Sequence, residues 1–166
     1  MDALTHVRGD GAVHMVDVSG KPVTTRTATA EARLVTLPAV VAQLVAGELP
    51  KGEALATARV AGILAAKRTS DLIPLCHPLP IERIEIDFEA AAGQIAVRAS
   101  VTTTGRTGVE MEAMTAVSIA AVTLYDMIKG VHRAATIEGV RVLQKSGGAS
   151  GEWTPDAGES GDEGAP

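Results

Sequence analysis

Two segments in which apolar and polar residues alternate place the strongest constraint on the fold of this chain. Their apolar positions are Ile84, Ile86, Phe88, Ile95, Val97, Ala99 and Val101. A period of two puts these side chains on one face of a strand, and Gly93 lies at the turn between the two segments. The pattern therefore predicts a β-hairpin with one apolar face, which other elements must cover.

Further strands and helices flank this hairpin. The Thr- and Val-rich segment 23–35 predicts a strand, 12–18 a short strand and 139–145 a last strand. Three helices are predicted. The first lies in segment 36–50, with Thr36 as its N-cap and its end at Gly47. The second covers 52–68 and ends at Lys67 and Arg68, and the third covers 110–133. The order is strand, helical region, strand, strand, helix, strand. We therefore expect an α+β, ferredoxin-like (βαββαβ) fold with helices packed on one face of an antiparallel sheet.

Charge is distributed unevenly along the 166 residues, which suit one domain. From Ser146 onward the chain carries five acidic residues and no Lys or Arg, so the rest of the chain has fifteen basic and fifteen acidic residues. We expect a flexible N-terminus at 1–12, a single domain at 13–153 and a disordered acidic tail at 154–166. The neutral domain, with no basic helix face, argues against a nucleic-acid partner.

Other classes of protein are disfavoured by composition. No run of eighteen apolar residues or signal-peptide pattern is present, which predicts a cytoplasmic protein without a membrane partner. The single cysteine excludes an intramolecular disulfide and a multi-cysteine zinc site. Aromatic residues, at 2%, are too few for a module that stacks bases.

The helix predicted near 110–133 carries a narrow polar stripe. At 100° per residue, all of the following lie within about 120° of arc: Glu112, Thr115, Thr123, Asp126, Lys129 and Arg133. One interpretation is a solvent-facing stripe on an amphipathic helix. The other is an enclosed helix on which Asp126 and Lys129, at i and i+3, tune each other's pKa, with a desolvated lysine that works near neutral pH.

The length of this stripe raises a geometric question. Glu112 and Asp126 are fourteen residues apart, which is about 21 Å along a straight helix. The two carboxylates therefore cannot reach the same reacting atom within one chain. Either they serve opposite ends of a long ligand, or sites form between subunits.

The segment "DLIPLCHPLPI", residues 71–81, places the only cysteine beside a histidine. Adjacent residues of an extended segment point to opposite faces, which disfavours Cys76 and His77 as nucleophile and base. A lone Cys and His also make a poor metal site. Separated basic residues give a weak indication of an anionic ligand: Lys51 before Gly52, the pair Lys67–Arg68, and Lys145 before a glycine-rich segment. Ordinary residues at helix ends would give the same pattern.

Four longer strings carry more specific information. They are "HMVDVSGKP", "PKGEALATARVAGILAAKRTSDLIPLCHPLPI", "TGVEMEAMTAVSIAAVTLYDMIKG" and "VRVLQKSGG". In order and without large gaps, from about residue 13 to about residue 153, the chain resembles the cyclic pyranopterin monophosphate synthase family of molybdenum cofactor biosynthesis. It departs from the common family pattern at Ala149, where relatives often carry Lys, at Ile128 and at His132.

The resemblance implies a lyase, of the phosphorus–oxygen type, that converts 3′,8-cyclo-7,8-dihydroguanosine 5′-triphosphate to cyclic pyranopterin monophosphate and pyrophosphate. It implies a homohexamer, a trimer of dimers, with active sites between subunits. No cofactor or protein-bound metal is implied, although magnesium can accompany the substrate phosphates. By motif, the catalytic residues are Lys51, Asp126 and Lys129. Substrate-binding residues are Leu75, Cys76, His77, Met111 and Glu112, with Glu110, Lys67, Arg68 and Lys145 added.

Three alternatives stay open from the sequence. One is a binding module, because ferredoxin-like domains often bind small ligands without catalysing a reaction. Another is a scaffold protein with no catalytic activity. A Cys–His hydrolase built on Cys76 would lose activity on substitution of that residue, whereas the synthase would be affected only modestly. The joint presence of Lys51, Asp126 and Lys129 favours catalysis.

Overall fold

A computed structural model describes residues 12–149 and 151–155 of the chain. It contains four strands, β1 (Thr24–Val35), β2 (Ile81–Ala91), β3 (Gln94–Gly105) and β4 (Thr136–Ser146). Its helices are α1 (Pro38–Ala46), α2 (Ala54–Ala66), α3 (Thr69–Leu72) and α4 (Glu110–Ile128). Apart from the short α3, which sequence periodicity does not predict, the element order is the expected one.

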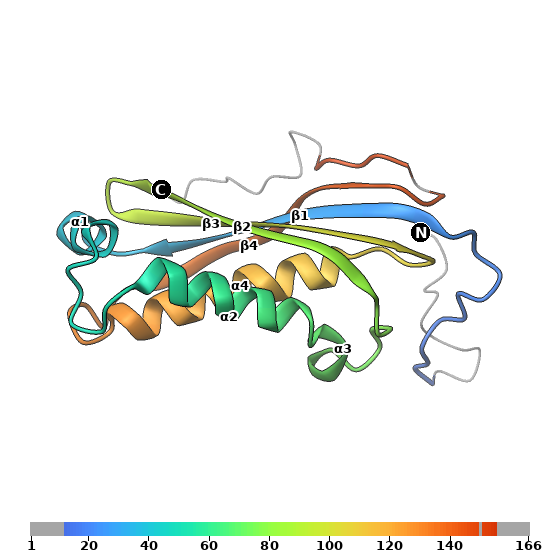
Figure 1. Ribbon diagram of the computed structural model, residues 1–166, viewed down its shortest axis with the longest axis horizontal. Coiled ribbons are helices and arrows are strands. Elements are labelled where there is room, and N and C mark those ends of the chain that lie inside the picture. Colours follow the sequence, from blue (N-terminus) through green and yellow to red (C-terminus); the bar gives the residue numbers. More distant parts are fainter. Residues whose placement is uncertain (1–11, 150, 156–166) are drawn as a thin grey trace.

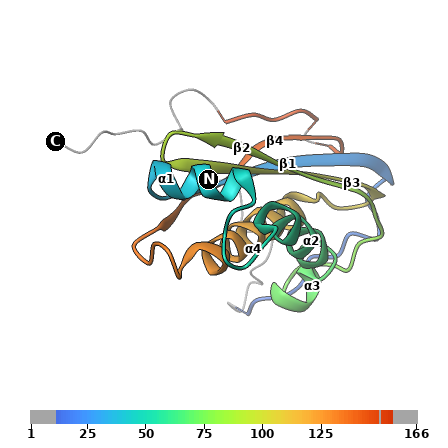
Figure 2. The ribbon, with the colours of Figure 1, turned by 60° about the vertical axis from the view of Figure 1, so that its left-hand side comes forward.

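The strands form one antiparallel sheet in the order β2-β3-β1-β4. Figures 1 and 2 show the long helices on one side of it, with α4 against the sheet and α2 beside α4. The α+β, ferredoxin-like prediction is therefore confirmed. The β2–β3 hairpin turns at Gly93, whose φ of 81° is a left-handed conformation that glycine adopts without steric cost.

Small side chains fill the space between the sheet and α4. Four alternate residues of β1 and four alanines of α4 are fully buried: Ala28, Ala30, Ala32, Leu34, Ala113, Ala116, Ala120 and Ala121. Alanine lets helix and sheet backbones approach closely, and burial of apolar surface stabilises the fold. The enclosed-helix interpretation of the sequence is confirmed.

Helix α4 is also long and apolar enough to cross a membrane by length and composition. More than half of that stretch is buried inside the protein. Its apolar character is therefore explained by its position between the sheet and α2, as the core helix of a folded unit.

The opposite face of the sheet is polar. Glu31, at its centre, is 6% exposed and accepts a 2.9 Å hydrogen bond from Arg98 Nε. Arg141 Nη2 lies 3.5 Å from the same carboxylate. A nearly buried charge on this face is therefore compensated by two cations.

Four boundaries differ from the sequence predictions. Residues 12–23 form no strand beyond one bridged residue, Val13, so the strand expected at 12–18 is absent. Leu37, not Thr36, is the N-cap of α1, since the Thr36 hydroxyl bonds elsewhere. Helix α4 ends at Ile128, so Arg133 lies beyond the helical stripe, and β4 is longer than predicted.

The two termini are described only in part. The expected flexible segment 1–12 and disordered tail 154–166 fall almost entirely outside the described residues. Among the described residues next to the tail, Trp153 and Lys145 exchange two backbone hydrogen bonds of 2.9 Å. The chain therefore returns to the edge strand β4 at Trp153, just before the expected tail at 154–166.

We predict that Gly62→Ala destabilises the protein by about 2 kcal/mol, because α2 and α4 meet closely at this position. A Cβ there would lie 2.5 Å from Ile86 Cδ1 and 2.9 Å from the Ala116 carbonyl oxygen. The same change in an open helix would be stabilising by about 1 kcal/mol, so the sign identifies the packing effect. Urea denaturation measures it, with Gly20→Ala, which meets nothing within 4 Å, as the control. An unchanged midpoint for Gly62→Ala would contradict the prediction.

Candidate active site

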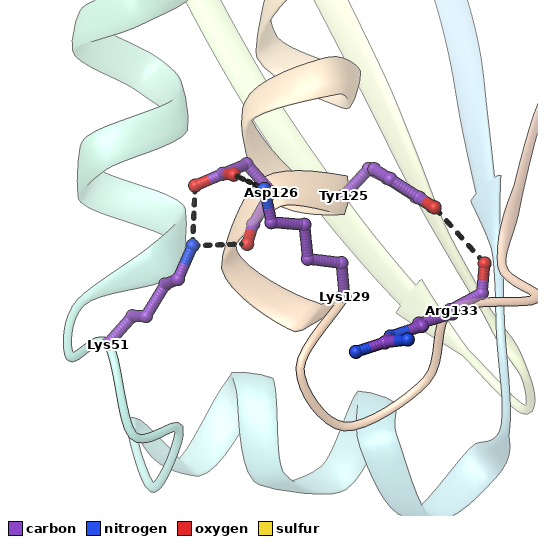
Figure 3. Close-up of polar contacts among 5 residues, drawn as sticks. All are labelled: Lys51, Tyr125, Asp126, Lys129 and Arg133. Carbon is purple, nitrogen blue, oxygen red and sulfur yellow. Dashed lines mark hydrogen bonds and ion pairs between the residues drawn. The ribbon is translucent and has the colours of Figure 1, made fainter.

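Two lysines meet one carboxylate at the C-terminal end of α4 (Figure 3). Lys51 Nζ donates to Asp126 Oδ2 at 2.7 Å and to the Asp126 backbone oxygen at 2.7 Å. Lys129 Nζ lies 2.6 Å from Asp126 Oδ1. We call Lys51, Asp126 and Lys129 the catalytic triad candidate; the three side chains are about half exposed.

Local structure explains this meeting. Asp126 occupies the last turn of α4 and Lys129 is its C-cap, so helical spacing alone brings the pair together. Lys51 comes from the α1–α2 connection, where buried Leu49 anchors a turn closed by the bond from Gly52 N–H to Leu49 O, 2.9 Å. The Asp126–Lys129 pair follows from sequence spacing, whereas the contribution of Lys51 depends on tertiary structure.

The triad has a strong electrostatic bias. Hydrogen bonds from Lys129 first, and Lys51 second, lower the pKa of Asp126 to about 2. The carboxylate in turn raises the pKa of Lys129. The expectation of a desolvated lysine titrating near neutral pH is therefore wrong for Lys129, because its exposed ammonium is held by a carboxylate. At neutral pH it is a proton donor and a binder of anions.

A cavity of about 520 Å³ lies at the other end of α4. Six of the predicted substrate-binding residues line it, namely Leu75, Cys76, His77, Glu110, Met111 and Glu112. Its walls are mostly apolar, with Val16 and Val18 from the segment before β1 and Ile73 and Leu79 from the loop between α3 and β2. We call this the apolar cavity; its form suits a flat ring system held by a few polar groups.

Burial shifts two groups in the apolar cavity. Glu112 is 4% exposed, and burial first, then the charge of Glu110, raises the pKa of its carboxyl. Burial, with a smaller effect of Glu112, also raises the pKa of the Cys76 thiol. A raised thiol pKa opposes thiolate formation, so the structure disfavours Cys76 as a nucleophile.

A second cavity, of about 360 Å³, adjoins the first. Its lining includes four basic side chains from four parts of the chain, Lys21, Arg26, Arg106 and Lys145. The two cavities share Lys21, Thr107, Gly108 and Glu110 in their walls. We call the second one the basic cavity; its charge and its connection to the apolar cavity suit the phosphates of a nucleotide.

Hydrogen bonds fix these basic side chains. Arg26 Nε donates to Gly105 O at 3.0 Å, and Arg106 Nε donates to Lys21 O at 3.2 Å. Lys145 forms a 2.9 Å ion pair with Glu110. A Cβ on Gly148, whose φ is 73°, would overlap the Arg26 guanidinium, so glycine is needed for this close approach.

Sequence reasoning found only part of this arrangement. It missed Lys21, Arg26 and Arg106 as site residues, because isolated basic residues on different elements have no common spacing. Lys67 and Arg68 line neither of the two cavities; Lys67 borders a separate hollow of about 260 Å³ with Arg83. Among residues 12–149 and 151–155, no cluster of three or more metal-ligating side chains occurs.

The triad lies at the C-terminal end of α4, and the two cavities lie at its N-terminal end. Glu112 and Asp126 are separated by fourteen residues, or about 21 Å of helix. The structure thus places the sequence-predicted residues in two groups within one chain, as the length of the polar stripe predicted.

Comparison with known proteins identifies the family of this chain. The model of the MoaC family matches residues 15–148. A cyclic pyranopterin monophosphate synthase of Corynebacterium glutamicum (strain R) is 58% identical over 93% of this chain and 99% of its own length. The cyclic pyranopterin monophosphate synthase of Streptomyces coelicolor is 58% identical over 92% of this chain and 90% of its own length. Cyclic pyranopterin monophosphate synthase 2 of Mycobacterium tuberculosis (strain H37Rv) is 58% identical over 91% of this chain and 90% of its own length. With the family model covering both cavities and the triad, the chain belongs to the MoaC family.

Proposed function

We propose that this protein is a cyclic pyranopterin monophosphate synthase of molybdenum cofactor biosynthesis. Its substrate is 3′,8-cyclo-7,8-dihydroguanosine 5′-triphosphate, and its products are cyclic pyranopterin monophosphate and pyrophosphate, which makes it a phosphorus–oxygen lyase. The observation that carries the proposal is the identity of 58% with relatives of that name over most of both chains. The basic cavity, the apolar cavity and the triad support it.

The basic cavity binds the triphosphate. Lys21, Arg26, Arg106 and Lys145 neutralise its charge and stabilise the pyrophosphate as it leaves. Lys67 and Arg68 join this role only if they reach the site from another subunit. Magnesium accompanies the substrate phosphates, and no protein-bound metal or redox cofactor is required for the rearrangement.

The apolar cavity holds the ring system. Leu75 and Met111 contact its faces, and His77 and Glu112 bond its polar edge. Burial favours the protonated form of Glu112, which can then donate a hydrogen bond to a ring nitrogen or oxygen. Cys76 contributes to the wall without acting as a nucleophile.

The triad performs the proton transfers. Lys129, an ammonium because of Asp126, donates a proton to the opening ring, and Lys51 acts in a second acid–base step and in neutralising phosphate charge. Asp126 keeps both lysines oriented and holds Lys129 in its charged form between turnovers. One carboxylate thus controls two acid–base groups at once.

The two groups of residues come together between subunits. A separation of about 21 Å along α4 is too large for both groups of one chain to act on the same atom. We propose a homohexamer, a trimer of dimers, in which the triad of one subunit faces the cavities of another. The substrate is a small molecule, neither nucleic acid nor membrane is a partner, and the protein acts in the cytoplasm.

The direct test is incubation with the cyclic triphosphate, with pyrophosphate and an oxidisable pterin measured as products. A protein that binds the substrate but releases no pyrophosphate would be a binding module and not a synthase. Release that is abolished by thiol alkylation and by Cys76→Ser would instead favour a Cys–His enzyme.

In the same assay we predict that Arg26→Ala raises KM by about tenfold or more, with a smaller effect on kcat, because a charged contact to phosphate is lost. Arg141→Ala removes the same charge on the opposite face of the sheet and serves as the control. Equal KM values for the two variants would contradict the assignment of the basic cavity to phosphate.

A further inference from the structure

His132 makes the one described side-chain hydrogen bond between the α4–β4 connection and the segment that leads into α1. Its Nδ1 lies 2.9 Å from Thr36 Oγ1, across 96 positions of sequence. Thr36 is 8% exposed and its own N–H bonds Gly93 O at 2.8 Å, at the tip of the β2–β3 hairpin. The histidine is therefore bonded to a buried, well-anchored partner.

Both ends of this bond lead to the triad. His132 lies three residues after Lys129, and its backbone N–H bonds Ile128 O at 2.9 Å, the last residue of α4. Thr36 begins the segment that passes through α1 and ends at Lys51. The Thr36–His132 bond thus joins the two chain segments whose lysines share the Asp126 carboxylate.

A second contact holds the same connection. The Tyr125 hydroxyl donates to Arg133 O at 3.1 Å, on the side of α4 away from Asp126 (Figure 3). This contact fixes the connection to α4 itself, within one segment. Only the histidine contact relates the connection to the segment that carries Lys51.

We propose that His132 is a positioning residue, which through Thr36 sets the distance between the Lys51 and Lys129 ammonium groups on Asp126. This inference rests on the proposed function for its kinetic consequence, but not for its structural one. Two lysines can share one carboxylate only while the backbone segments that carry them keep their relative positions. A displacement of a catalytic group by about 1 Å lowers the rate by a large factor.

The kinetic test uses His132→Ala, Thr36→Val and the double variant. Each single change lowers kcat about tenfold and leaves KM within about twofold, because neither change removes a cation of the basic cavity. The double variant is no slower than the singles, since both changes remove the same bond. His132→Asn restores kcat, because its amide atoms lie at the same number of bonds from Cα as Nδ1.

Thr136→Val is the matched control. It removes the 2.7 Å hydrogen bond from Thr136 to Glu138, a local contact that begins just after the same connection. Its kcat stays at the wild-type value. If it fell as far as that of His132→Ala, or if the asparagine failed to restore kcat, the positioning role would be overturned.

A second measurement does not need the enzymatic assay. Acetic anhydride reacts only with unprotonated amines, and mass spectrometry gives the acetylation rate of each lysine. In His132→Ala and Thr36→Val, Lys51 or Lys129 reacts about threefold faster than in wild type, because a loosened ion pair protects the amine less, while Lys67 is unchanged. Unchanged rates at both triad lysines would overturn the inference. A wild-type protein that releases no pyrophosphate would refute the proposed function and leave this labelling result standing.

Discussion

Asp126→Ala lowers kcat by about 10³-fold, the scale expected for loss of positioned acid–base catalysis. The substitution removes the only carboxylate that both triad lysines contact in the described residues. Lys51 and Lys129 then repel each other, neither keeps its position, and Lys129 loses the rise in pKa that the ion pair gives it. KM changes less than kcat, because the four cations of the basic cavity that bind the triphosphate are left in place.

Asp126→Asn tests the contribution of the negative charge, because it removes the charge and nearly preserves the shape of the side chain. The amide retains an oxygen that accepts a hydrogen bond but lacks the negative charge that raises the pKa of Lys129. We expect it to lose nearly as much activity as the alanine. Asp87→Ala, an exposed carboxylate on β2, controls for the change in net charge. Wild-type turnover by Asp126→Ala would show that the triad is not the catalytic group.

Mixed oligomers of two inactive variants regain about a quarter of wild-type activity if sites form between subunits that assort at random. One variant is Asp126→Ala, which lacks the triad. The other carries Arg26→Ala and Lys145→Ala, which together remove two cations of the basic cavity. In a mixed assembly some sites receive an intact triad from one subunit and an intact cavity from its neighbour.

Co-expression with two different affinity tags, followed by purification on both, yields these mixed assemblies. Each variant alone is the control, and mixing after purification tests for subunit exchange. If each site belonged to a single chain, no intact site could form. Activity no higher than that of the separate variants would therefore refute the inter-subunit site, without refuting the synthase reaction itself.

Local patterns gave the fold because its elements are strongly periodic. The alternation around Gly93 fixed the hairpin, and the apolar character of 110–128 fixed the core helix. The end of α4 was placed too far along the chain because Lys129 to Arg133 continue a polar stripe on a helical wheel. In the structure a connection replaces the helix there, held by side-chain bonds that no local pattern encodes.

The sequence predicted only those parts of the candidate site whose residues are close together in the chain or belong to a family motif. Asp126 and Lys129 are one turn apart, and helical spacing predicts their contact. Lys51 reaches them across 75 positions, so only the family motif suggested it. Arg26 and Arg106 come from β1 and the β3–α4 connection, and only the tertiary structure shows that they line one cavity.

The alanine-rich contact between α4 and the sheet also limits how the sequence can change over time. Ala28, Ala30 and Ala32 of β1 and Ala116 and Ala120 of α4 have no exposed surface. A change to valine or leucine at these positions adds volume that a close-packed interior cannot accept without moving backbone. Substitution in this interior is therefore filtered by size more than by polarity, and inherited variation should accumulate on the helix faces that α4 and the sheet do not share.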